Sequence, residues 1–163
     1  MRSYIEAITE ELIDDWIDDG EVDLLNRLCV PLPIYVIADQ LGVPRTELAL
    51  LKKWSDASVS RLGRLADEEQ QIQNARDIVE FQHYFADLID RLREKPEDNI
   101  ISDLANNTID EGRLLTKAEA LGMIQQILVA GNETSTNAIA GGVVLLIQNP
   151  EEQAKLRSSP DLI

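Results

Sequence analysis

One stretch constrains the fold of this chain more than any other: residues 116 to 149 contain no proline, and they begin with a helix-start signal. Thr116 is followed three residues later by Glu119, which is the spacing of a capping box. The next proline is Pro150. We therefore predict a helix of about 32 residues, roughly 48 Å long at 1.5 Å per residue. Because both ends of this segment are apolar on most sides, the helix should cross the middle of a domain.

The other segments also have helical periodicity. Apolar residues recur at three- and four-residue steps from Ile5 to Trp16, and Pro33 and Pro44 suit the first turns of two further helices. Asn149 and Pro150 are expected at the start of a short final helix. A long segment before Pro96 has an apolar period that consists of Ile72, Ala75, Val79, Gln82, Phe85, Ile89 and Leu92. No alternating strand pattern occurs, so the predicted fold class is all-α, with one core helix of about 30 residues.

Composition narrows the choice of partners and compartment. The chain has 163 residues, 44% of them hydrophobic, which is enough for one domain with a sizeable core. Thirty acidic and fifteen basic residues give a net charge of −15, which argues against nucleic acid and membrane partners. The acidity fits simple solubility or a cationic protein partner.

Cys29 is the single cysteine, so an intramolecular disulfide is impossible and a reducing compartment is expected. The first residues lack the apolar segment of a signal peptide. The longest apolar run, residues 138–147, is about half of what a bilayer span requires. We therefore expect a cytoplasmic protein.

The centre of the long helix is unusually polar. Glu133 and three hydroxyl residues at 134–136 lie between apolar flanks, and Gly131 precedes them. Hydroxyls that bond back to a carbonyl one turn earlier bend helices, so a kink or bulge is predicted near residues 130–136. Two interpretations remain open from the residues alone. The small residues permit close helix packing while Glu133 reaches solvent, or Glu133 and Thr134 handle protons in a pocket.

A family resemblance favours the second interpretation. Residues 130–135, Ala-Gly-Asn-Glu-Thr-Ser, resemble the oxygen-activation motif of the cytochrome P450 haem-thiolate monooxygenases. The segment from residue 110 to 163 resembles soluble bacterial members throughout. The segments "PLPIYVIADQLGVP", residues 31–44, and "LLKKWSDA", residues 50–57, are similar to family segments as well. The resemblance covers essentially the whole chain.

The resemblance implies a role for each motif residue. Ala130 and Gly131 match positions whose smallness lets the helix lie against haem, with Thr134 and Ser135 beside the same cofactor. Thr134 matches the hydroxyl that hydrogen-bonds the oxygen ligand or a nearby water, and Glu133 matches the acid that relays protons from solvent. Ser135 replaces a commoner threonine.

The resemblance also implies a substrate surface and external partners. Gln126, Val129 and Ala130 match positions that face the substrate pocket. The segment 55–69 corresponds to the mobile lid of the family. A small, mainly apolar organic substrate and a ferredoxin-type redox partner are expected.

Two sequence features of the family have no match in this chain. The family binds haem iron through a cysteine in a glycine- and phenylalanine-rich loop, and none of these residues matches that loop. Cys29 has the wrong surroundings for an axial ligand, and His83 is interpreted as a surface or packing residue, so no metal ligand is predicted. The family's Glu-x-x-Arg pair has no match either.

Residues 1–163 are therefore expected to be the central part of a cytochrome P450 domain, without the N-terminal portion or the haem-ligand portion. We expect this chain alone to bind haem unstably, to be inactive and to self-associate. The alternative is a non-catalytic helical interaction module, or a self-associating remnant of the same fold.

Overall fold

The computed structural model describes residues 1–63, 67–109 and 112–159. Within these ranges the chain is helical and has no β-strand, so the all-α prediction is confirmed. The only pairing of strand type there is an isolated antiparallel bridge between Thr108 and Leu114. Within the same ranges, no helix has both the length and the apolar character needed to cross a bilayer.

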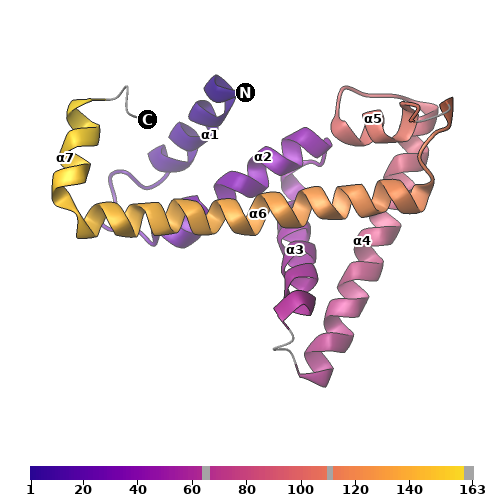
Figure 1. The fold of residues 1–163 in the computed structure, drawn as a ribbon, viewed down its shortest axis with the longest axis horizontal. Coiled ribbons are helices and arrows are strands. Elements are labelled where there is room, and N and C mark those ends of the chain that lie inside the picture. The colour runs from indigo at the N-terminus through magenta and orange to yellow at the C-terminus, as the bar shows by residue number, and fades with distance from the viewer. Residues whose placement is uncertain (64–66, 110–111, 160–163) are drawn as a thin grey trace. The chain divides into compact units, whose positions relative to one another are not determined.

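The chain divides into two compact units. Unit 1 consists of Met1–Leu32 and Glu133–Ile163, and unit 2 consists of Pro33–Asn132. The elements of unit 1 are α1 (Arg2–Asp14), the π-helical turn η1 (Leu25–Cys29), the C-terminal part of α6 (Lys117–Gln148) and α7 (Pro150–Ser158). Unit 2 contains most of α2 (Pro31–Leu41), the 3-10 turn η2 (Arg45–Glu47), α3 (Leu48–Gly63), α4 (Glu68–Glu94), α5 (Ile100–Asn106) and the N-terminal part of α6. Figure 1 labels each helix along the chain.

Helix α6 confirms the principal sequence prediction. It spans 32 residues, and the capping box is present: the Thr116 amide donates to Glu119 Oε2 at 2.8 Å, and the Glu119 amide donates to Thr116 Oγ1 at 3.3 Å. Arg113 adds two hydrogen bonds of 2.9 Å to the Glu119 carboxylate. The start of the longest helix is therefore fixed by local side-chain chemistry.

The bonds at this cap predict how the start of α6 responds to pH. The Arg113 guanidinium and the Thr116 donors stabilise the ionised carboxylate and lower the pKa of Glu119 from 4.5 to about 2. Since the folded-state pKa is depressed, the stabilising contribution is complete above about pH 4.5 and is lost as pH falls towards 2. In an NMR titration, we expect the Glu119 carboxyl to titrate near 2 and the backbone shifts of residues 116–122 to lose helical character over the same interval. In Glu119→Gln that local transition should be absent. A Glu119 midpoint near 4.5 would contradict the prediction.

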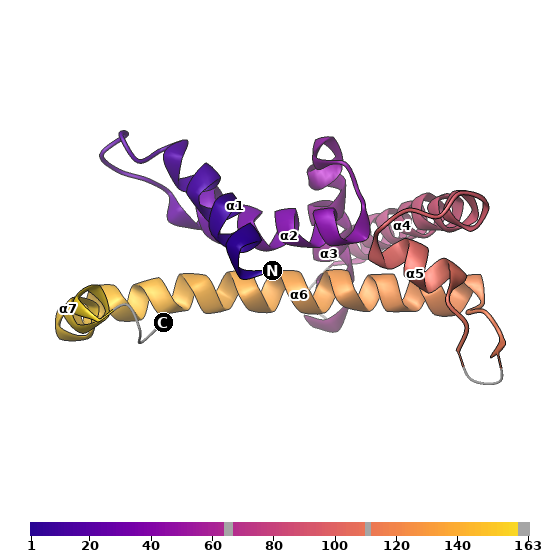
Figure 2. The same ribbon diagram turned by 90° about the horizontal axis from the view of Figure 1, so that it is seen from above.

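The core of unit 2 lies between α3 and α4, which lie side by side and are followed by α5 packed on α4 (Figures 1 and 2). Trp54 of α3 is almost completely buried, and its ring centroid is 5.8 Å from the ring centroids of both Phe81 and Phe85 of α4. The two phenylalanine centroids are 4.7 Å apart. Edge-to-face and tilted aromatic pairs at such distances add to the stabilisation from buried area.

The exposed face of α4 differs from the sequence prediction. The C-terminal half buries Phe85, Ile89 and Leu92 as expected, but Ile72 and Val79 are about half exposed. The remaining two members of the predicted apolar period, Ala75 and Gln82, are also exposed. The N-terminal half instead buries Asn74, Ile78 and Phe81. The predicted face was therefore wrong for this half, because contacts with α3 decide which side of the helix is covered.

The end of α2 has a geometry that only glycine suits. Gly42 has φ of +71°, and the amides of Gly42 and Val43 donate to the carbonyls of Asp39 and Ala38, which is a Schellman motif. A Cβ at Gly42 would lie 2.5 Å from Asn99 Nδ2. The other half of that amide caps α5, because Asn99 Oδ1 accepts from the Ser102 amide at 2.9 Å. Gly42 therefore ends one helix and leaves room for the cap of another.

At the junction of α6 and α7 the predicted elements are correct, but one side chain acts differently. Pro150 is the first residue of α7, as predicted. Asn149 precedes it but makes no side-chain cap to α7. Its Nδ2 donates to the Leu145 carbonyl of α6 at 2.8 Å instead. The asparagine thus satisfies a free carbonyl at the end of the preceding helix.

Candidate functional site

The motif residues lie on an unbroken stretch of α6. Every residue from Lys117 to Gln148 is α-helical, without a π or 3-10 turn, so the predicted bulge at 130–136 is wrong. Glycine and hydroxyl residues each weaken a helix by at most about 1 kcal/mol. The long helical segments on both sides therefore keep residues 130–136 helical despite the low helix propensity of these residues.

Two faces of α6 differ sharply in exposure. One side carries Ala120, Ile124, Leu128 and Asn132, four residues apart, and each is at most 1% exposed. The other side carries exposed residues at similar steps: Met123, Gln126, Ala130, Thr134 and Asn137. We call this second set the open face of α6. Its members recur at three and four residues, so they form a single stripe along the helix.

The predicted site residues are distributed around this stripe. Gln126, Ala130 and Thr134 belong to the open face, whereas Val129 and Ser135 are half-buried beside it. Glu133 is also half-buried, and the Asn137 amide donates to its carboxylate at a long 3.5 Å. The helix therefore presents one small residue, one hydroxyl and an adjacent acid on the same side.

Gly131 serves a packing contact within unit 2. A Cβ at this position would lie 3.1 Å from Ile37 Cδ1 of α2, which is tighter than most real Cβ contacts. A larger residue would therefore require the end of the Ile37 side chain to shift. This contact matches the packing interpretation of the small residues, and it involves the side of the helix next to the open face.

Sequence reasoning missed the polar contacts that join α6 to α3. Asn132 Nδ2 donates to Ser55 Oγ at 3.0 Å, and both side chains are buried. Gln125 Nε2 donates to Ser58 Oγ at 3.1 Å. The signal was present in the spacing, because Asn132 continues the buried stripe of Ala120, Ile124 and Leu128. An amide at such a position requires a partner.

The Asn132 amide is only half satisfied. Its Oδ1 is buried and makes no hydrogen bond within the protein. A buried polar group without a partner costs on the order of 1–3 kcal/mol. The residue at the centre of the motif is therefore held by a directional contact that carries a stability cost.

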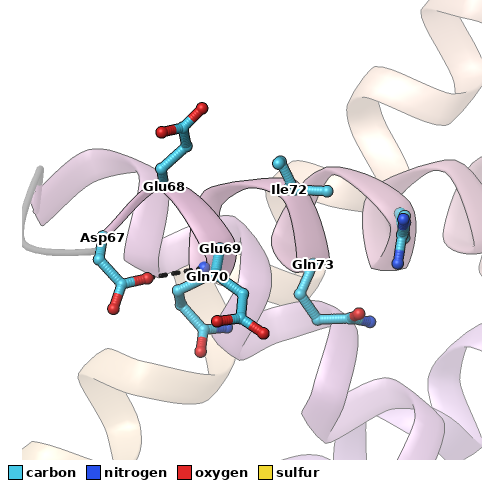
Figure 3. A pocket seen from close by; sticks show the side chains of 7 residues that line it. Asp67, Glu68, Glu69, Gln70, Ile72 and Gln73 are labelled. Atoms are coloured by element: carbon cyan, nitrogen blue, oxygen red, sulfur yellow. Dashed lines mark hydrogen bonds between the residues drawn. The ribbon is translucent and has the colours of Figure 1, made fainter.

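Unit 2 also contains hollows away from the motif. A polar hollow of about 710 Å³ lies at the start of α4, where Asp67 accepts from the Gln70 amide at 2.8 Å (Figure 3). It is lined by Asp67, Glu68, Glu69, Gln70, Ile72, Gln73 and Arg76. A smaller apolar hollow of about 210 Å³ lies between α5 and the start of α6 and includes Leu104 and Met123. Neither is lined by Gln126, Val129 or Ala130.

The predicted lid segment, residues 55–69, falls partly outside the described residues, which omit 64–66. Its described parts are the end of α3 and the start of α4.

Among the residues that the structure describes, the possible iron ligands do not form a haem-binding set. Cys29 is 1% exposed in η1, and burial raises the pKa of its thiol, which favours the protonated form over the thiolate that iron requires. His83 is exposed on α4, as predicted. Across the described ranges, no three His, Cys, Asp or Glu side chains gather as a metal-binding group. Ala130 puts only a methyl group on the open face of α6, as a flat cofactor lying against that face would require.

The helical fold and the motif on α6 together define a protein class. The sequence model of the family Cytochrome P450 matches residues 36–161. The chain belongs to the cytochrome P450 family.

The relatives that the chain matches include bacterial members of that family. The cytochrome P450 monooxygenase PikC of Streptomyces venezuelae is 36% identical over 165 aligned residues, which cover 100% of this chain and 38% of PikC. The solved structure of the polyketide synthase cytochrome P450 PksS of Bacillus subtilis 168 superposes with a TM-score of 0.88 at 31% identity, covering 98% of this chain and 40% of PksS. P450BioI, solved with an acyl carrier protein bearing hexadec-9Z-enoic acid, has a TM-score of 0.89 at 29% identity and the same coverage. The chain thus spans about two fifths of the relatives it matches.

Proposed function

We propose that residues 1–163 are the central, oxygen-activating and substrate-lining part of a haem-thiolate monooxygenase that oxidises a small, mainly apolar organic molecule. The observation that carries the proposal is the open face of α6, where Ala130 and Thr134 lie one turn apart with Glu133 beside them. Membership of the cytochrome P450 family supports the same reaction class.

In this proposal each side chain has a simple task. Bound haem would supply the iron centre at which dioxygen is activated. Ala130, with only a methyl group, leaves space on the open face, and the Thr134 hydroxyl holds and passes a proton at its Oγ1. Glu133, half-buried next to Thr134, takes protons from solvent and passes them through water to the Thr134 hydroxyl. Gly131 and Ser135 complete the cofactor-facing turn, and Gln126, Val129 and Ala130 contact the substrate.

Further parts of the proposal concern partners and compartment. We propose a cytoplasmic protein that receives electrons from a ferredoxin-type partner. The relative P450BioI was solved with an acyl carrier protein, so docking of a protein partner has a precedent among the structural neighbours.

We further propose that these 163 residues alone do not hold haem stably and are not catalytically active, since Cys29 is buried as a thiol and is the sole cysteine. A second candidate function is that of a self-associating helical module. Three apolar residues near the end of α6 favour it, because Val144, Leu145 and Ile147 are 51%, 61% and 66% exposed. Such side chains gain stability when another surface covers them.

A haemin titration separates the two candidates. The purified chain alone is expected to give no thiolate-type band in a carbon-monoxide difference spectrum. Addition of a polypeptide that carries the family's cysteine loop should produce that band. No band under either condition would defeat the enzymatic proposal. On a size-exclusion column the chain alone is expected to elute as oligomers, and a compact monomer would count against the self-associating module.

A further inference from the structure

We infer that Ser55 and Asn132 are positioning residues: their buried hydrogen bond fixes the rotation of α6 against α3 and so sets the direction of the open face. The catalytic consequence rests on the proposed function, whereas the geometric role does not. Asn132 continues the buried stripe formed by Ala120, Ile124 and Leu128, where an aliphatic side chain would fill the space as well. The residue present is instead an amide whose Nδ2 reaches Ser55 Oγ at 3.0 Å.

A second hydrogen bond also joins α6 to α3. Gln125 Nε2 donates to Ser58 Oγ at 3.1 Å, and the Ser58 hydroxyl donates to the Trp54 carbonyl at 2.8 Å. The Ser58 hydroxyl therefore donates its proton within α3, and its oxygen accepts the hydrogen bond from Gln125 of α6. The two donors are seven residues apart on α6, about two turns, so both lie on the same side. A rotation of α6 by one residue position, about 100°, would break both bonds.

The unpaired half of the Asn132 amide indicates why the contact is present. Oδ1 is buried without a hydrogen-bond partner in the protein, so this asparagine does not maximise stability. Buried asparagines in helix interfaces fix register and orientation at a cost in stability, because only one arrangement satisfies the amide. We assign the same role to the Ser55–Asn132 pair, which fixes orientation at a cost in stability.

The pair acts on the open face because of its place on the helix. Ala130 and Thr134 each lie two residues from Asn132, about 200° around the helix axis. A bond that holds Asn132 against α3 therefore points Ala130 away from α3. In this way Ser55, distant in sequence, determines where the first residue of the motif is directed.

The test measures orientation and stability separately in the 163-residue chain. Nitroxide labels are placed at two exposed positions of unit 2, with Asp56→Cys on α3 and Met123→Cys on α6, in a Cys29→Ser background. The double variant Ser55→Ala/Asn132→Leu replaces the polar pair by apolar residues. We expect its urea midpoint to be unchanged or raised, because such replacements are often neutral or stabilising. The label–label distance should broaden or shift by about 3 Å or more, as a rotation of about 40° on a helix of about 5 Å radius requires.

The matched control is Ile124→Ala, which removes packing from the same buried stripe without touching the polar pair. Its urea midpoint should fall while its distance distribution stays that of the parent. Should the double variant not fold, Ser55→Ala alone carries the test with the same expected change in distance. A distribution identical to the parent in the polar variant overturns the inference. Because the measurement needs no haem, a failed haemin titration would leave this result standing, and the reverse also holds.

Discussion

Trp54→Ala is expected to lower the free energy of unfolding by roughly 3–5 kcal/mol, the range measured for removal of large aromatic side chains from protein cores. Trp54 is 1% exposed and contacts the rings of Phe81, Tyr84 and Phe85 on α4, at centroid distances between 5.2 and 5.8 Å. Its removal leaves a cavity between α3 and α4, and the two helices can only partly close it. Urea unfolding followed by circular dichroism measures the change without relying on tryptophan fluorescence.

The matched control is Ile72→Ala on α4. Ile72 is also a large apolar residue, but it is 50% exposed, so the change should alter stability by no more than about 0.5 kcal/mol. The pair of variants thus tests which face of α4 is covered. A loss near 3 kcal/mol for Ile72→Ala, or one below about 1 kcal/mol for Trp54→Ala, would show that the α3–α4 contact differs from the one described.

Thr134→Ala is expected to have the largest effect on the proposed reaction. The measurement uses the chain in a holoenzyme whose haem-ligand segment is supplied. Loss of the hydroxyl removes the proposed proton donor of the open face, and a positioned proton donor contributes about 10²–10⁴-fold in enzymes. We expect the ratio of oxidised product to hydrogen peroxide to fall by about tenfold or more, because reducing equivalents then leave as peroxide. Substrate binding, measured by optical titration, should be nearly unchanged.

Thr134→Ser provides the control, since it keeps the hydroxyl and removes only a methyl group. Its product-to-peroxide ratio should stay close to that of the parent. Unchanged coupling in Thr134→Ala would remove this residue from the mechanism, even though its place on the open face would remain.

The long helix was predictable because its signals are local. Thr116 and Glu119 are three residues apart, and Pro150 lies just beyond the end of α6, so both limits could be derived from neighbouring residues. The end of α2 at Gly42 has a local signal as well, because glycine is the commonest residue just past the end of a helix. The π-helical turn at Leu25–Cys29 carries no comparable local signal, and the sequence analysis did not anticipate it.

The orientation of α4 could not be derived in this way. Ile72 and Val79 form a periodic apolar stripe, yet the covered side contains Asn74 and Asp77. These polar residues have partners on both helices. Asn74 Nδ2 donates to Ser60 Oγ of α3 at 2.9 Å. Asp77 Oδ1 accepts from Gln73 Nε2 of α4 at 3.0 Å and lies 3.8 Å from Lys53 Nζ of α3. Apolar periodicity alone cannot predict that a polar side chain is buried because it has a hydrogen-bond or ionic partner.

The candidate site was predictable only as a motif. Family resemblance located Ala130, Glu133 and Thr134, and the structure places Ala130 and Thr134 on one face with Glu133 beside them. Family resemblance did not locate Ser55, because tertiary packing determines that this residue, 77 positions away, is the hydrogen-bond partner of Asn132. The expected bulge failed for a related reason: local residue preference is a weak guide inside a helix supported on both sides.

The close approach of Gly42 to Asn99 has an evolutionary consequence. A methyl group at position 42 would displace the amide that starts α5 and would also sit in an unfavourable backbone conformation. Two positions 57 residues apart are thereby expected to be inherited together. Lineages that acquire a side chain at the first should also show a different helix-starting residue at the second, whatever molecule their enzymes oxidise.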